Sequence, residues 1–131
     1  MSEHFLKVKD YLLNLEYQIV SEDVNEEILV ISQEEDGISN LVIDCEDSII
    51  IIETLLFEIK NGSEAIFKSL LIKNREIVHG AFVLDETGSK LIFRDTLQLE
   101  TLDQNELEAS INSLKILLSE YSEELIKFSK A

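Results

Sequence analysis

The segment HGAFVLDETG, residues 79–88, contains the residue types most capable of chemistry in this chain. His79 could bind a metal ion, and Asp85 with Glu86 could form a carboxylate pair for acid–base catalysis. The other histidine, His4, is far away in the sequence and has no HxxxH or HxH spacing. Adjacent residues at the end of a strand point in opposite directions, so the two acids would not converge. We therefore predict a hairpin with solvated acids, and no zinc site.

The other chemically capable residues also lack a complete motif. Cys45 is the only cysteine, so it forms no internal disulfide, and its setting in LVIDCED predicts the end of a buried strand. Asp44, Glu46 and Asp47 resemble a calcium loop but lack the D-x-D-x-D-G pattern and the glutamate at its twelfth position. The chain has no Gly-rich phosphate loop and no G-x-S-x-G turn. We predict no enzyme activity, no cofactor and no metal.

The charge of the chain limits its partners. The 27 acids against 11 Lys and Arg residues give a formal charge of -16. Such a surface repels nucleic-acid phosphates and anionic lipid headgroups, so neither is expected as a partner. A protein partner is expected to be basic rather than acidic.

Length and hydrophobicity predict one globular domain over residues 1–131, because a hydrophobic fraction of 45% is sufficient for a continuous core. The start, MSEHFLKVKDYLL, lacks the features of a secretory signal, and no apolar run approaches the length of a membrane span. We expect a soluble, cytoplasmic protein.

Hydrophobic periodicity in the first half predicts one helix and three strands. From His4 to Leu15 the apolar residues recur at helical spacing, which indicates an amphipathic helix. Three runs rich in Ile, Val and Leu follow, separated by short acidic segments. These runs predict consecutive antiparallel strands over residues 26–32, 38–45 and 48–59.

The second half predicts two helices separated by a hairpin. Asn61-Gly62-Ser63 breaks the chain before a short helix that ends near Asn74. Strands over 77–84 and 90–99 follow, joined by the loop 85–88. A long helix over 103–129 completes the order, which is an α+β fold with a mainly antiparallel five-stranded sheet.

The long helix has a strong start signal. Asp103 can accept a hydrogen bond from the amide of Glu106, and Glu106 can reach back as in a capping box. Leu102 can pack on Leu107 across the first turn.

The segments LLIKN, HGAFVLDETG and LIFRDTLQLETLDQNEL resemble the signature region of the YbjN-like and class I type III secretion chaperone-like (Tir chaperone-like) superfamily. The match is densest over residues 66–107, and the predicted order α-β-β-β-α-β-β-α agrees with the secretion-chaperone-like fold. The matching positions, which we expect to be structural, are Leu70, Leu71, Asn74, Gly80, Phe82, Leu84, Asp85, Gly88, Leu97, Leu99, Leu102, Asp103, Glu106 and Leu107.

The resemblance implies a small, acidic, cytoplasmic and usually dimeric protein. It further implies that such a protein binds an unfolded segment of a protein client without using ATP. An alternative within the same resemblance is a homo-oligomeric regulatory or scaffold protein of the YbjN-like type, without a secretion client.

Residues 10–59 are unusual in both charge and hydrophobicity. They hold fourteen acids and no Lys or Arg, and the runs 28–31, 41–43 and 49–52 are apolar at both alternating positions. Both faces of this half therefore require cover, either from the three helices or from a second subunit or a partner segment. We expect an extended, basic-apolar segment to bind here, at Leu29, Ile31, Glu34, Glu35, Asp36, Ile49 and Ile51.

Overall fold

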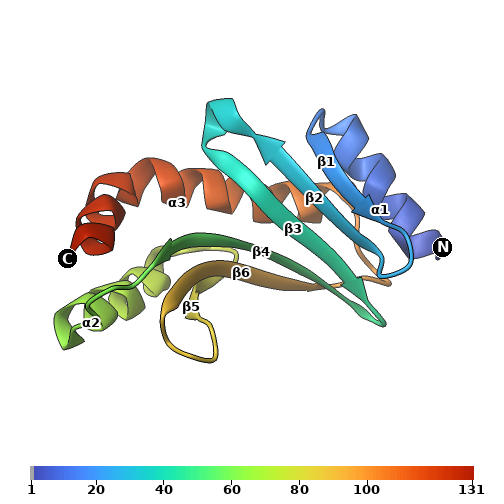
Figure 1. Ribbon diagram of the computed structural model, residues 1–131. Helices are drawn as coiled ribbons and strands as arrows, with labels where there is room; N and C mark the ends of the chain where they lie inside the picture. The colour runs from blue at the N-terminus through green and yellow to red at the C-terminus, as the bar shows by residue number, and fades with distance from the viewer. Residues whose placement is uncertain (1) are drawn as a thin grey trace.

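The computed structural model describes residues 2–131 and shows one α+β architecture, a sheet with helices packed on it (Figure 1). A helix precedes four strands, a second helix precedes a two-stranded hairpin, and a long helix ends the chain. The elements are α1 (Glu3–Asn14), β1 (Gln18–Asp23), β2 (Ile28–Gln33), β3 (Ile38–Glu46), β4 (Ile49–Glu58), α2 (Glu64–Lys73), β5 (Ala81–Leu84), β6 (Lys90–Gln98) and α3 (Gln104–Lys130). Two 3₁₀ turns are also present, η1 (Glu34–Asp36) and η2 (Asn74–Glu76).

The sheet has the strand order β1-β2-β3-β4-β6-β5, and every neighbouring pair is antiparallel. The predicted α+β class and helix positions are confirmed, but the predicted number of strands is wrong, because the sheet has six strands rather than five. The missed strand is β1, with the sequence QIVSED. It is an edge strand that is exposed at nearly every position, so burial imposes no apolar alternation on it.

All three helices contribute to one core on one face of the sheet. The buried side chains Phe5, Val8 and Leu12 of α1 join Ile66 and Leu70 of α2 and those of α3 in a single cluster. The sheet contributes alternate positions to the same cluster, and in Figure 1 α3 passes behind β2 and β3. Those positions are Leu29, Ile31, Leu41, Ile43, Cys45, Ile50, Ile52, Phe82, Leu91 and Phe93.

Of the start signals predicted for the long helix, the cap at Asp103 is present, but among the described residues the Glu106 side chain accepts no hydrogen bond from the Asp103 amide. The Asp103 carboxylate accepts a 2.8 Å hydrogen bond from the amide of Glu106, and the Ser63 hydroxyl accepts one of 3.2 Å from the amide of Ile66. Leu102 and Leu107 are both buried beside the first turn of α3. These caps satisfy amides that have no partner within their own helices.

Replacing Asp103 with Ala should lower the free energy of unfolding by about 1 kcal/mol, because the first turn of α3 loses its cap. Urea denaturation followed by circular dichroism measures this change. Asp103→Asn is the matched control, since Asn caps as well as Asp. Equal stability of the Ala and Asn variants would show that the cap contributes nothing.

Candidate functional site

The face of the sheet opposite the helices has no covering element within residues 2–131. Cross-strand pairing arranges its side chains in rows. One row runs Ile28–Asp44–Ile51–Thr96 and the next runs Val30–Val42–Glu53–Arg94. We call this surface the open face and define it by Ile28, Val30, Val42, Asp44, Ile49, Ile51, Glu53, Arg94 and Thr96.

The open face is apolar at its centre although no helix packs on it. Ile51 is only 8% exposed, and Val30, Val42 and Ile49 are half-buried by their neighbours on the sheet. These side chains belong to three adjacent strands, so apolar residues of β2, β3 and β4 are neighbours on this face, with Asp44 and Glu53 among them. Apolar side chains gathered on a face that no helix covers are typical of a site that another molecule covers.

Carboxylates are distributed over the same surface. Asp44 lies directly between Ile28 and Ile51 in its row, and Glu46 lies opposite Ile49. Burial, with a further contribution from the nearby Glu46, raises the pKa of Asp44 to about 6. Arg94 is the one base in the two rows, and it pairs with Glu53 at 3.3 Å. The open face is therefore apolar with a net negative charge.

The predicted partner-binding residues do not form one surface. Leu29 and Ile31 are fully buried under the helices, so the prediction is wrong for these two, and their neighbours Ile28 and Val30 occupy the open face instead. Ile49 and Ile51 do lie on the open face. Contact of a partner with these two residues stays a prediction.

The predicted acidic turn lies elsewhere. Glu34, Glu35 and Asp36 form η1, which approaches α3 at the end of the β2–β3 hairpin. The carboxylate of Asp36 accepts a 2.8 Å hydrogen bond from Gln33 and forms a 3.4 Å ion pair with Lys115. Asp36 therefore links the hairpin to α3, although Glu34, Glu35 and Asp36 are all exposed.

The histidine-containing segment forms a hairpin and a structural contact. The hydroxyl of Ser113 donates a 2.7 Å hydrogen bond to the carbonyl of His79 and accepts one of 3.3 Å from its amide. Asp85 accepts hydrogen bonds from the amides of Ser89 and Lys90, both at 3.0 Å, and these bonds hold its pKa below the usual range. Within residues 2–131, no three His, Cys, Asp or Glu side chains are placed to hold a metal ion.

Cys45 has the properties of a core residue. It is 5% exposed, and burial raises the pKa of its thiol to about 12, with smaller contributions from Glu27 and Asp44. The thiol is therefore protonated at neutral pH, and a protonated thiol is a poor nucleophile.

Asn74 protects the edge strand β5. Its side-chain oxygen accepts a 2.8 Å hydrogen bond from the amide of Phe82, and its side-chain nitrogen donates one of 3.2 Å to the carbonyl of Phe82. The amide group thus pairs with the outer edge of β5 as a neighbouring strand would. The sequence match gave the position of Asn74 but not this role.

The other motif positions are mainly structural. Leu70, Phe82 and Leu107 are buried in the core, and Leu97 packs against it. Gly80 has a φ of +84°, and an added Cβ would come within 2.6 Å of the Phe93 ring. Of the remaining positions, Gly88 is in the hairpin turn, with a φ of +73°, while Leu71 and Leu84 are exposed.

Leu71 and Leu84 line an apolar cleft between α2 and β5. It has a volume of about 240 Å³, and none of its lining residues is charged. Leu71 is 68% exposed and Leu84 is 43% exposed. We call it the α2–β5 cleft, and it is lined by Phe67, Leu70, Leu71, Phe82, Val83, Leu84 and Leu91.

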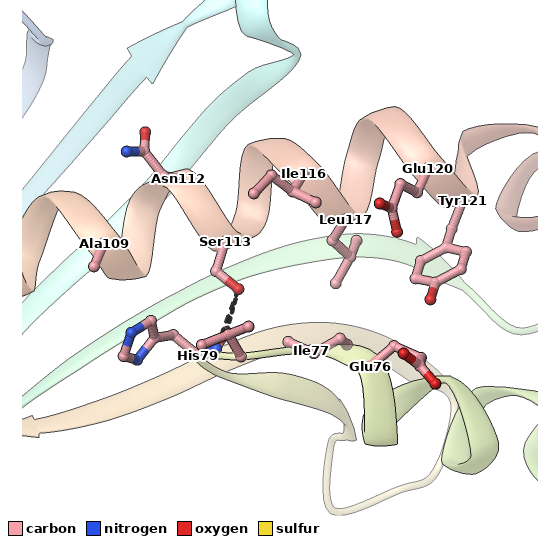
Figure 2. Close-up of a pocket in the computed structure, with 11 residues that line it drawn as sticks. Glu76, Ile77, His79, Ala109, Asn112, Ser113, Ile116, Leu117, Glu120 and Tyr121 are labelled. Atoms are coloured by element: carbon pink, nitrogen blue, oxygen red, sulfur yellow. Dashed lines mark hydrogen bonds between the residues drawn. The ribbon is translucent and has the colours of Figure 1, made fainter.

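A second groove runs along α3, and sequence reasoning missed it (Figure 2). It has a volume of about 330 Å³, and its walls come from α3 and from residues 76–79. The contact depends on the bond between His79 and Ser113, which are 34 positions apart, so no local pattern reveals it. We call it the α3 groove.

Comparison with known proteins identifies the family. The CesT_Tir_1 family model matches residues 1–131. The chain belongs to this family of type III secretion chaperones. No curated protein matches the chain in sequence. Within residues 2–131 no helix has both the length and the apolar content that a membrane crossing requires.

Solved structures show the same fold as this CesT_Tir_1 family chain. A chain of the HopA1–SchA chaperone–effector complex is 15% identical, with a TM-score of 0.63 and coverage of 100% of this chain and 99% of that one. YbjN, described as a putative transcription regulator from E. coli, is 14% identical with a TM-score of 0.70. A chain of the ExsC–ExsE complex is 17% identical with a TM-score of 0.66. The last two similarities cover 92% of both chains.

Replacing Asp44 with Asn should stabilise the protein at pH 7. A carboxyl whose pKa is raised on folding takes up a proton more readily in the folded state, so the free energy of unfolding falls as pH rises from about 4 to 6. Because solvent screens this partly exposed group, we expect a gain of at most about 1 kcal/mol.

Urea denaturation across this pH range measures the effect. The advantage of Asp44→Asn should shrink as pH falls below the pKa of Asp44. Asp47→Asn, at an exposed turn position nearby, is the matched control and should show no such change. A pH-independent difference between wild type and Asp44→Asn would contradict the unfavourable burial of a charged Asp44.

Proposed function

We propose that this protein is a non-enzymatic, chaperone-like module that holds an extended segment of a partner protein on its open face without ATP, in the cytoplasm. Membership of the CesT_Tir_1 family supports a protein-binding role. The observation that carries the choice of surface is the group of apolar side chains on β2, β3 and β4 that no element within residues 2–131 covers.

The chemistry of the open face specifies the partner segment. Val30 and Val42 offer apolar contact, while Asp44 and Glu46 offer negative charge beside them. Apolar burial would supply most of the affinity, and Lys or Arg side chains of the partner would meet the carboxylates. The expected segment therefore alternates apolar residues with basic ones, since side chains of an extended chain alternate in direction.

Replacing Val42 with Lys should weaken binding of such a segment by at least about tenfold. The change removes apolar contact at the centre of the face and repels basic side chains. The measurement is fluorescence anisotropy with a labelled peptide that alternates Val and Lys. Val24→Lys is the matched control, because Val24 is a valine outside the open face, 41% exposed in the β1–β2 turn.

The salt dependence of binding distinguishes the role of charge from the role of apolar burial. Rising salt should slow association more than it speeds release, because screening acts on the encounter while apolar burial sets the residence time. Two results would refute the open face as the site. One is equal affinity of wild type and Val42→Lys for the peptide of Val and Lys, and the other is equally strong binding of a peptide of Val and Glu.

Self-association is the second part of the proposal, and the α2–β5 cleft is its proposed contact. A chain with a formal charge of -16 repels its own copies, so two copies would meet where charge is absent. The cleft fulfils this condition, because its lining residues are uncharged and two of its leucines are exposed. A homodimer of the YbjN-like type that lacks clients is the alternative function, and it would keep this contact while binding no segment.

Replacing Leu71 with Glu should convert a dimer into a monomer of 15.0 kDa. The added charge would be desolvated in the contact, which opposes association. Light scattering at tens of micromolar measures the mass, and Leu13→Glu, at an exposed leucine on α1, serves as the control. A wild-type protein that is monomeric at this concentration would contradict the proposed dimer.

A further inference from the structure

The α3 groove differs from the open face in place and in chemistry. It lies on the helix side of the sheet, where α3 meets the segment that leads into β5 (Figure 2). Its lining on α3 runs from Ala109 to Tyr121, a length of roughly 18 Å at the usual helical rise. Leu117 and Tyr121 line it, and the exposed side chains of Val78 and Ile116 flank it.

The groove is too open for a small molecule to be its natural occupant. Val78 is 85% exposed and Ile116 is 57% exposed, so the apolar walls face solvent. Sites for small molecules usually enclose most of the ligand surface. An elongated protein segment fits a groove with such walls better.

The backbone around the groove favours a helical segment. The amide and carbonyl of His79 are both occupied by the hydroxyl of Ser113, and the amide of Ile77 donates to the carbonyl of Asn74. The backbone of α3 is satisfied within its own helix. An extended partner would need free backbone groups to pair with, whereas a helix satisfies its own.

Charge defines one end of the groove. Glu76 and Glu120 lie on opposite walls near Tyr121, as Figure 2 shows, and His79 lies toward the other end. No Lys or Arg lines the groove. Lys73 is close to the Tyr121 ring, at 5.5 Å, but it is paired with Glu124 at 2.7 Å. The Tyr121 end therefore favours a positive charge.

We propose that the α3 groove binds a short amphipathic helix of a partner protein, with its apolar side chains between Val78 and Ile116 and a Lys or Arg at Glu76 and Glu120. A second copy of this chain is a poorer occupant. Its basic helix end, with Lys127 and Lys130, is held in place by the buried Leu125 and by the 3.2 Å bond from Asn61 to the carbonyl of Ala131.

The test uses a labelled amphipathic peptide of about 15 residues, because shorter isolated helices are marginal in water. It consists of Leu, Ala and Gln with two Lys residues in its last turn, and a second peptide carries Glu in place of Lys. The intact protein is titrated with each peptide, followed by anisotropy, and amide chemical shifts identify the residues that change.

The Lys peptide should bind and shift the amides of residues 76–79 and 109–121. Ile116→Glu should weaken it by at least about tenfold. Ile126→Glu is the matched control, because Ile126 is 53% exposed on the same helix but does not line the groove. The double replacement Glu76→Lys with Glu120→Lys should reverse the preference toward the Glu peptide.

Three outcomes would overturn the proposal. The first is an equal loss of peptide affinity in Ile116→Glu and Ile126→Glu, and the second is an unchanged preference for the Lys peptide in the double variant. The third is a change from dimer to monomer in Ile116→Glu, measured by light scattering, which would assign the groove to a second copy. Val42→Lys should leave binding of the Lys peptide intact. A failure of the groove is thereby distinguishable from a failure of the open face.

Discussion

The packing of three helices on one face of a six-stranded sheet is the constraint on which the rest of this structure depends. Burying a Leu or Ile side chain fully contributes about 1.5–3 kcal/mol, so the helix face supplies the stability of the fold. Ile50 and Ile52 are fully buried there, whereas the alternating Ile49 and Ile51 have only neighbours on the sheet. The chain therefore folds with an apolar surface left over, and that surface can serve binding because stability does not require its burial by a helix.

Both edges of the sheet carry features that hinder the addition of a strand, which favours association at faces and grooves. At one edge, the side chain of Asn74 occupies both hydrogen-bonding groups of Phe82 in β5. At the other edge, β1 is short, acidic and interrupted by a bulge between Ile19 and Ser21. Both devices hinder the addition of a foreign strand. An apolar sheet can thus remain partly open without an exposed edge that promotes aggregation.

Much of the fold followed from local sequence patterns, and the exceptions have physical causes. The caps at Ser63 and Asp103 depend on nearby residues, so they were predictable. Strand β1 was missed because an exposed edge strand has no hydrophobic period. Leu29 and Ile31 were placed on the binding surface because a run that is apolar at both alternating positions does not reveal which positions face the helices. The packing of the helices determines which positions are buried, and only the tertiary structure shows where the helices pack.

The candidate surfaces were less predictable than the fold, because each combines residues distant in sequence. The α3 groove requires His79 beside Ser113, and the role of Asp36 requires Lys115 beside the β2–β3 hairpin. The negative charge of the first half was visible in the sequence, but its division between a structural pair at Asp36 and the open face was not.

Asp44 shows how charge and apolar surface are combined on the open face. A carboxylate between Ile28 and Ile51 is partly desolvated, and the nearby Glu46 and Glu53 add repulsion, so its charged form is disfavoured at rest. A basic side chain placed over this row would reverse the balance, because an opposite charge favours the ionised form of the carboxyl. The same neighbours that disfavour the charge of Asp44 in the free protein would then attract the partner. The acid at position 44 lowers the stability of the free protein. Binding of a basic segment would recover part of this loss, whereas binding of an acidic segment would not.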